Sequence, residues 1–382
     1  MGLASLVFGG LPPALQIGGD YNLLIQTLYI LLFFVLIFFG QRIQLQLILM
    51  ELGNVIGHLD RMRRMGREEA LKKLKHYSKN SQLEEIFNRV IESFVIFPES
   101  MDPSGIIRKL EHIMDIRETR FINDVKKMIN NDEVSESMIK TMSNMVEASM
   151  ALNMLYKIAL HYYLLAKKTN SYFIAAQLQM QAPLIISFAR AYLQAVYAFR
   201  DGAPVGDGIG PLVVNKFMSD KKVVKKKEDY VKDTSLYEID YMNRRVFIVK
   251  AKGPGGNVGK PGEAIKKVIT RMKKDIKLVI MIDAALKLEG EKTGTIAEGV
   301  GAAIGGIGVE KFKIEEIVTK YNIPLYAIII KMSLIEAISI MSKKIASVYD
   351  DVIKRVDRVI KEETNEGDAV IVAGIGNTVG IP

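Results

Sequence analysis

The chain has 382 residues, of which 49% are apolar and 25% charged, and this globular composition argues against intrinsic disorder. It contains no cysteine, which excludes disulfides, thiolate metal sites and cysteine nucleophiles. The net charge of +9 points to an anionic partner, either lipid or nucleic acid.

A long apolar stretch near the N-terminus predicts a transmembrane helix over residues 23–40. No charged residue lies between Asp20 and Arg42, a length sufficient to cross about 30 Å of hydrocarbon. Lys and Arg are absent before this stretch and frequent after it. The positive-inside rule therefore predicts a single-pass protein of the cell membrane, with the lipid bilayer as a partner, residues 1–22 extracytoplasmic and the bulk of the chain cytoplasmic. A cleaved signal peptide is the alternative, which the missing basic segment and cleavage site disfavour.

Residues 41–200 are nearly free of glycine and carry apolar residues at helical spacing, which predicts a cytoplasmic region of several packed helices. Within it, residues 170–190 form a second apolar stretch, interrupted by three glutamines and Pro183. Because these residues are costly in lipid, we expect a buried helix or one that faces another copy in a homo-oligomer. A second membrane span is the alternative.

The composition changes after Arg200, where 20 of the 30 glycines lie. Short β-branched runs separated by glycine turns alternate there with amphipathic helices, which predicts an α/β domain over 201–382 with a largely parallel sheet. The expected strands are 236–241, 246–251, 278–283, 325–330 and 369–373. The expected helices are 262–274, 314–321 and 334–362.

The lysine-rich run at residues 221–227 is expected as a loop or a solvated hairpin edge. No aromatic residue interleaves with its lysines, so nucleic acid is disfavoured as a partner. The four histidines, His58, His76, His112 and His161, all precede the α/β domain and show no metal-ligand spacing.

Three acidic residues of this domain are candidate catalytic groups. Asp207 lies among glycines immediately before a predicted helix. Asp283 ends an apolar strand, where a carboxylate costs free energy unless it is paired, hydrated or used. Either could merely cap a helix, but together they could share a proton and polarise a water molecule. Glu298 lies in a third segment, which is expected to be a glycine-rich loop.

Several glycine turns could let a backbone or a ligand approach closely. The segment 253–267 leads from such a turn into a helix whose N-terminus could hold a phosphate, although Pro254 and Pro261 depart from a Walker A loop. The turn at 374–378 could equally be structural. The candidate ligand-binding residues are Gly255, Gly256, Lys260, Gly299, Gly301, Gly374, Gly376, Asn377 and Thr378.

Three of these segments together resemble the fold shared by hydrogenase-maturation peptidases and the spore germination protease. In that group one strand ends in GxGN, an acidic residue precedes GxG or LGP and a helix, and another strand ends in IDA. The matching segments here are Gly374–Asn377, Asp207–Pro211 and Ile282–Ala284. The GxGN strand comes last in this chain, so the resemblance requires a circular permutation. It implies an aspartate pair, Asp207 and Asp283. The maturation peptidases also use a histidine to hold metal; this domain has none, so no metal cofactor is expected.

The whole chain also resembles an uncharacterised archaeal membrane-protein family known as domain of unknown function 1512. That resemblance implies an architecture and a lineage but no activity. The cysteine-free, Ile- and Lys-rich composition agrees with a thermophilic origin.

The leading functional hypothesis is a peptidase-like hydrolase domain tethered to the inner face of the membrane. Asp207 and Asp283 would activate water, and backbone amides of 374–378 and 299–306 would stabilise the oxyanion. Whether the chain is an enzyme stays open. The alternative is a non-enzymatic module in which the same site recognises a peptide or small ligand and the helical region builds an oligomer. A phosphate-containing ligand at residues 255–260 is a third hypothesis.

Overall fold

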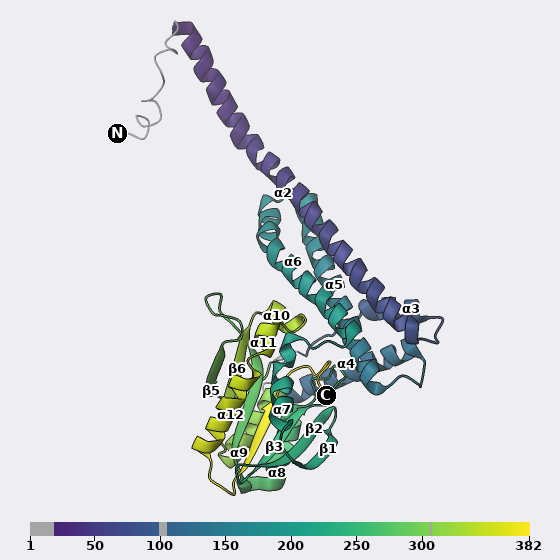
Figure 1. Cartoon of the computed structure of the whole chain (residues 1–382). Helices are drawn as coiled ribbons and strands as arrows, with labels where there is room; N and C mark the ends of the chain where they lie inside the picture. Colours follow the sequence, from purple (N-terminus) through teal and green to yellow (C-terminus); the bar gives the residue numbers. More distant parts are fainter. Residues whose placement is uncertain (1–18, 99–104, 306–307) are drawn as a thin grey trace. The chain divides into compact units, whose positions relative to one another are not determined.

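The computed structural model describes residues 19–98, 105–305 and 308–382 of the chain (Figure 1). Two compact units are present, residues 1–58 with 157–184 and residues 59–156 with 185–382. The long helices α2 (Gly19–Tyr77), α5 (Glu136–Thr169) and α6 (Tyr172–Asp201) run from one unit into the other. Most of the predicted extracytoplasmic segment 1–22 lies outside the described residues.

In its described part, the first unit consists of portions of these three helices. Most large apolar side chains of α2 between Leu23 and Val35 are exposed, by 42 to 68%. By length and composition α6 could cross a membrane, whereas α2 qualifies only when Leu23–Val35 and Gly40–Tyr77 are joined as a bent pair. Core helices of soluble proteins meet the same test, so a membrane span over 23–40 stays a prediction.

The second apolar stretch, residues 170–190, forms most of α6. Its side chains Phe173, Met180 and Leu184 are exposed, so α6 is not a buried helix within the single chain. Exposed apolar surface of this kind marks a contact with another protein or with lipid. The oligomer-facing and membrane options for this segment therefore both stay predictions.

The second unit begins with the end of α2, followed by α3 (Leu83–Ile91), α4 (Ile106–Ile129) and the first part of α5. Apolar residues at helical spacing explain these elements: Leu83, Ile86, Phe87 and Val90 form the buried face of α3. The prediction of a helical region ahead of the α/β domain is confirmed.

The α/β domain is organised around a seven-stranded sheet of order β1-β2-β3-β7-β4-β6-β5 (Figure 1). Its strands are β1 (Val223–Val231), β2 (Thr234–Tyr241), β3 (Arg244–Ala251), β4 (Ile276–Leu286), β5 (Ile296–Val300), β6 (Leu325–Met332) and β7 (Ala369–Gly374). The last strand of the chain, β7, lies in the middle and pairs in parallel with β3 and β4.

Helices cover both faces of this sheet, and the side-chain alternation of the central strands fills both layers. Leu278, Ile280 and Ile282 of β4 pack in the core with α7 (Ile209–Met218) and α12 (Tyr349–Glu363). Val279 and Met281 point to the opposite face and pack with α8 (Pro261–Met272) and α9 (Val309–Tyr321). A strand covered on both sides explains the unbroken apolar run that the sequence shows there.

The sheet is mixed, so the prediction of a largely parallel sheet is wrong. Strands β3, β7, β4 and β6 are parallel, but β1 and β2 form an antiparallel hairpin series with β3, and β5 is antiparallel to β6. The lysine-rich run enters the edge strand β1, in line with the hairpin-edge alternative. The glycine-rich segment around Glu298 contributes strand β5, where a loop was expected, because backbone pairing with β6 compensates for its weak strand propensity.

The single helix expected over 334–362 is three helices: α10 (Leu334–Ile338), α11 (Lys343–Ala346) and α12. Ser339 and Ser342 adopt extended conformations, and the Ser342 hydroxyl accepts a hydrogen bond from the Ile345 N–H, which starts a new helix. Serine favours such caps, so the apolar periodicity alone overestimated the length of the helix.

Glycine is required where α7 crosses the sheet. A Cβ on Gly210 would lie 2.3 Å from the Ile375 carbonyl oxygen and 2.5 Å from that of Ile282. These atoms belong to the backbone at the ends of β7 and β4 and cannot move aside cheaply. The absence of a side chain at Gly210 therefore permits the close approach of three segments that are far apart in the sequence.

We expect Gly210→Ala to lower the free energy of unfolding by about 1–3 kcal/mol, because the added methyl group overpacks this crossing. Helix propensity alone would predict an increase in the free energy of unfolding, because alanine favours a helix more than glycine does. The measurement is thermal unfolding of the purified chain. Gly290→Ala is the control, since nothing lies within 4 Å of the Cβ that it would add. Equal unfolding midpoints for the two variants would contradict the packing argument.

Candidate active site

A cavity of about 560 Å³ lies at the carboxyl ends of the central strands, within the second unit. We call it the carboxylate cavity because Asp207 and Asp283 both line it. Asp207 comes from the turn before α7 and Asp283 from the end of β4, and Gly376 follows β7. The Ile375 N–H donates to the Ile282 carbonyl oxygen at 2.9 Å, which fastens the turn after β7 to β4. Three stretches that are distant in the sequence therefore meet in one site.

Asp207 sits in the 3-10 turn Gly206–Gly208 that leads into α7. Its Oδ2 accepts a hydrogen bond from the Asn377 N–H at 3.0 Å. No described side-chain oxygen is both fully buried and without a hydrogen-bond partner, so the other Asp207 oxygen is accessible from the cavity. Burial raises the pKa of Asp207, and the Asn377 N–H opposes that increase.

Asp283 is 6% exposed and lies near the carboxyl end of β4, three residues before its last residue Leu286. Its carboxyl group accepts hydrogen bonds from the N–H groups of Ala284, at 2.7 Å, and Gly305. Burial, and then the negative charge of Asp207, raise the pKa of Asp283 to about 8, although both N–H groups act in the opposite direction. At neutral pH Asp283 therefore keeps its proton.

The turn after β7 supplies a backbone donor beside this pair. Gly376 has φ +132°, and a Cβ there would lie 1.9 Å from the Asp207 carbonyl oxygen, so only glycine fits. Within the described chain, the Gly376 N–H has no hydrogen-bond acceptor, whereas the amides of Ile375, Asn377 and Thr378 are all used internally. Gly376 is thus the amide of this turn that remains available to a ligand.

Helices α4 and α5 form a wall of the carboxylate cavity, which sequence reasoning did not identify. The Asn144 side chain of α5 donates a hydrogen bond to the Gly256 carbonyl oxygen at 2.6 Å. In addition, three ion pairs link α4 to the α/β domain. These pairs are Lys260–Asp115 at 2.7 Å, Lys313–Glu111 at 2.6 Å and Lys232–Glu118 at 2.9 Å. The paired residues are at least 114 positions apart, so no local pattern could have revealed them.

Several predicted residues lie elsewhere. Glu298 is on β5 and forms ion pairs with Arg355, at 2.8 Å, and Arg358 of α12. Gly299 and Gly301 lie on or beside the edge strand β5, and the Gly301 N–H donates to the Leu325 carbonyl oxygen. None of the three lines the carboxylate cavity. The structure therefore does not bring Glu298, Gly299 or Gly301 to the aspartates. In the predicted 299–306 donor segment, Ile304 and Gly305 do line the cavity, and the Gly305 N–H bonds to Asp283, whereas Gly306 lies outside the described residues.

Other predicted residues are structural. Gly374 ends β7, where a Cβ would meet the backbone of Gly210. The buried Thr378 hydroxyl bonds to carbonyl oxygens of the 252–257 loop. Gly255 lies against Ser137 of α5, where a Cβ would be 2.8 Å from its Cα. These residues hold the turns in place, whereas Gly256, Asn377 and Lys260 lie at the cavity or contact its aspartates.

The α8 N-terminus is already occupied by protein groups, which disfavours the phosphate hypothesis at residues 255–260. The Glu263 N–H donates to the Glu310 carboxylate at 3.1 Å, and the Lys260 N–H donates to the Thr234 hydroxyl at 2.7 Å. The Lys260 ammonium group is paired with Asp115. An incoming phosphate would have to displace the Glu310 carboxylate, which competes for the same N–H groups.

Two family models cover nearly the whole chain. The one described as "Protein of unknown function (DUF1512) N-terminal domain" matches residues 26–202, and the one described as "Domain of unknown function (DUF1512) C-terminal" matches residues 205–382. No curated protein and no solved structure matches the chain. The second match begins two residues before Asp207 and includes both aspartates of the cavity.

We expect Asp283→Asn to stabilise the protein at alkaline pH. Between an unfolded-state pKa near 4 and the folded-state value of about 8, the folded chain binds the extra proton, so its stability falls as pH rises through this window. The neutral amide removes this loss, which is on the order of 5 kcal/mol at pH 8. Urea unfolding at pH 4.5 and pH 8 measures the difference. The control Asp240→Asn changes an exposed aspartate on β2 and should show the same pH dependence of stability as the wild type. If the Asp283 variant also shows the wild-type pH dependence, the raised pKa of Asp283 is refuted.

Proposed function

The chain belongs to the family described as protein of unknown function DUF1512, and we propose that its C-terminal domain hydrolyses amide bonds in peptides with Asp207 and Asp283 as the water-activating pair. One observation carries this proposal: two carboxyl groups from separate segments share a cavity, and one of them keeps its proton at neutral pH. Paired carboxyl groups in different protonation states are the arrangement that acid/base hydrolysis requires.

The two aspartates take complementary roles. Ionised Asp207, held through one oxygen by the Asn377 N–H, accepts a proton from water with its other oxygen. The water oxygen attacks the amide carbon, and a tetrahedral intermediate forms. Protonated Asp283 gives its proton to the departing nitrogen as the C–N bond breaks, which leaves a carboxylic acid and an amine. The Gly376 N–H is the available donor to the developing oxyanion.

The lining of the carboxylate cavity supports a peptide substrate. Its volume of about 560 Å³ lies within the range of small-ligand sites, roughly 300–1,000 Å³. Apolar residues of the lining include Phe121 and Ile122 of α4, Val309 of α9 and Ile304 in the loop before α9. Asp283 is 6% exposed, so little water screens it from the Asp207 charge.

A non-enzymatic binding module is the second candidate. The charged side chains around the cavity are largely neutralised by one another, as in the pairs Arg117–Glu147 and Lys260–Asp115, and such a lining suits retention of an apolar ligand without chemistry. In that case the aspartates would contribute hydrogen bonds only. Binding of peptides without cleavage would favour this candidate.

We also propose that the domain is tethered to the cytoplasmic face of a membrane by one N-terminal span over residues 23–40. The exposed apolar side chains between Leu23 and Val35 and the basic residues that follow support this topology. The helix α6 offers a second apolar segment in the same unit. The substrate would then be a peptide reached from the cytoplasm or released at the membrane.

Asp207→Asn and Asp283→Asn are each expected to reduce peptide hydrolysis by about 100-fold or more, because either change removes a proton-transfer group. The assay incubates the full chain with a library of unstructured peptides and detects new termini by mass spectrometry. Glu298→Gln and Asp240→Asn are matched controls that alter carboxylates away from the cavity. Equal cleavage by wild type and both aspartate variants would remove the catalytic proposal.

Hydrolysis should decline as pH rises through about 8. Asp283 must be protonated to donate to the leaving nitrogen, and its raised pKa sets the upper limit of activity. The measurement is kcat/KM against pH for one cleaved peptide. A rate that continues to rise above pH 9 would show that Asp283 is not the acid, whereas Glu298→Gln should leave the profile unchanged.

Deletion of residues 1–40 should release the remaining chain from the membrane fraction, since the proposed span is then lost. The measurement is the amount of each protein, full chain or deletion variant, that sediments with membranes after carbonate extraction. Protease added to spheroplasts should leave the C-terminal domain of the full chain intact. Continued membrane association of the deletion variant would contradict the single-pass topology and assign a span to α6.

A further inference from the structure

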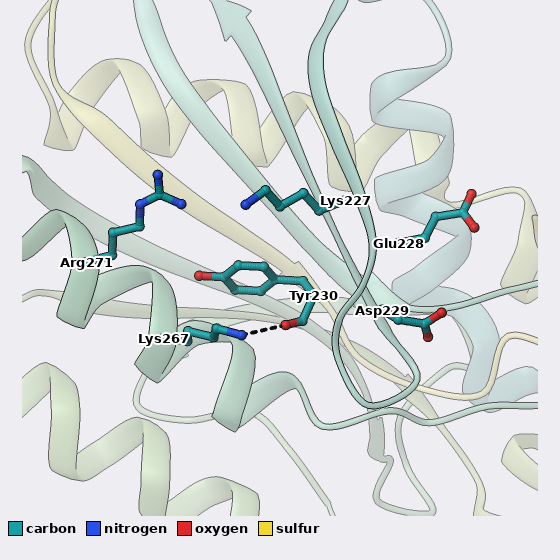
Figure 2. A pocket seen from close by; sticks show the side chains of 6 residues that line it. All are labelled: Lys227, Glu228, Asp229, Tyr230, Lys267 and Arg271. Carbon is teal, nitrogen blue, oxygen red and sulfur yellow. Dashed lines mark hydrogen bonds between the residues drawn. The ribbon is translucent and has the colours of Figure 1, made fainter.

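A second hollow lies on the α/β domain at the β1 edge of the sheet, apart from the carboxylate cavity. It has a volume of about 520 Å³ and is lined by residues of β1 and α8 (Figure 2). A smaller neighbouring hollow of about 120 Å³ shares Lys227, Tyr230 and Arg271 with it. We call these two hollows the basic groove and follow five of its polar residues: Lys225, Lys227, Tyr230, Lys267 and Arg271. Glu228, Asp229 and the ion pair Glu238–Arg245 also line the hollows.

The positive charges of the basic groove are concentrated on one side of β1. Figure 2 shows Lys227 and Arg271 extending from the strand and the helix into the same space, whereas Glu228 and Asp229 point away. Those two acids pair with lysines outside the groove, Glu228 with Lys226 at 2.7 Å and Asp229 with Lys252 at 2.5 Å. Strand alternation places Glu228 on the face opposite Lys227. Asp229 also points away because β1 is irregular between Lys227 and Val231, with a φ of +48° at Asp229.

Three cations within the groove lack such partners. In the described part of the chain, neither Lys225, Lys227 nor Arg271 forms an ion pair. Neighbouring lysines are neutralised by acids, so these three unpaired cations make the groove locally positive. Such a site attracts an anion.

Tyr230 organises the floor of the groove. Its carbonyl oxygen accepts a hydrogen bond from the Lys267 ammonium group at 2.8 Å, and that group lies 4.5 Å from the centre of the Tyr230 ring (Figure 2). The Lys227 ammonium group lies 5.8 Å from the same centre. Burial raises the pKa of the Tyr230 hydroxyl, so the hydroxyl remains a hydrogen-bond donor at neutral pH. An ammonium, a guanidinium and a hydroxyl donor thus share one hollow.

We propose that the basic groove binds a phosphate group. The planar Arg271 guanidinium can make two parallel hydrogen bonds to phosphate oxygens, and Lys227 adds a point charge. A nucleic acid base is a poorer fit because the faces of the Tyr230 ring are covered: Figure 2 shows Lys227 above it and Lys267 below it. The phosphate is carried either by a small soluble molecule or by a phospholipid headgroup.

The residues around the groove help to distinguish a phospholipid headgroup from a small soluble phosphate compound as the ligand. The smaller hollow has apolar residues on its floor, namely Leu236, Phe247, Val268 and Met272. Val223 and Val224 on the same edge strand are 41% and 54% exposed and are flanked by lysines. A basic surface with exposed apolar side chains is suited to the interface of an anionic membrane. A soluble phosphate would use the cations alone.

The test is calorimetric titration of the full chain in nonionic detergent with two probes, inorganic phosphate and dihexanoyl phosphatidylglycerol. The double variant Lys227→Gln/Arg271→Gln should weaken binding of the better probe by about tenfold or more, since both charge-assisted contacts are lost. The control Lys222→Gln/Lys277→Gln removes the same net charge from exposed lysines outside the groove and should remain within about twofold of wild type. Arg271→Lys should have an intermediate effect, because it keeps the charge but not the planar geometry.

Tighter binding of the lipid than of phosphate would support a headgroup as the source, and equal or weaker binding would support a soluble phosphate. The proposal is overturned if wild type binds neither probe saturably, or if both double variants lose the same affinity. The peptide assay of the aspartate pair is independent of this result, because no residue of the groove lines the carboxylate cavity.

Discussion

The shared burial of two carboxyl groups is the constraint on which the C-terminal domain depends. Asp283 follows the part of β4 that is buried on both faces, and its pKa of about 8 means that ionisation is opposed by the surrounding structure. Gly210 and Gly376 permit this arrangement, since a side chain at either position would push the Asp207 turn away from β4 and β7. A fold selected for stability alone would replace the pair with neutral residues, so its presence indicates a function.

The position of β7 explains how the site is assembled. The last strand of the chain inserts between β3 and β4, and the turn that follows it reaches the carboxyl end of β4. In parallel strands these ends lie on the same edge of the sheet, where loops from different strands can combine their polar groups. The order of the segments differs from that of the maturation peptidases, but a central strand supplied by the chain terminus is compatible with the permutation that the resemblance requires. The peptidase-like fold remains a proposal.

Helix α8 connects the carboxylate cavity with the basic groove. Its N-cap Lys260 and first residue Pro261 contribute to the cavity, and Lys267 and Arg271, farther along the helix, contribute to the groove. Twelve helical residues span about 18 Å, so both surfaces are held on one rigid element. A hydrolytic site and an anion site on a common helix would fix the orientation of the domain towards a phosphate-bearing surface.

Local patterns were sufficient to identify most elements and the two aspartates. The apolar runs at 236–241, 278–283 and 369–373 lie in strands. They could be recognised because a strand buried on one or both faces requires apolar side chains at neighbouring positions. Asp283 stood out for the same reason, as a charge placed at the end of such a run.

Pairing partners, in contrast, are set by contacts between residues far apart in the chain. Three features of the structure depend on such distant contacts and leave no signal in the local sequence. They are the antiparallel pairing of β5 with β6, the ion pair between Glu298 and α12, and the cavity wall formed by α4 and α5. Three-dimensional contact alone therefore separated the aspartate pair from the other acidic candidate.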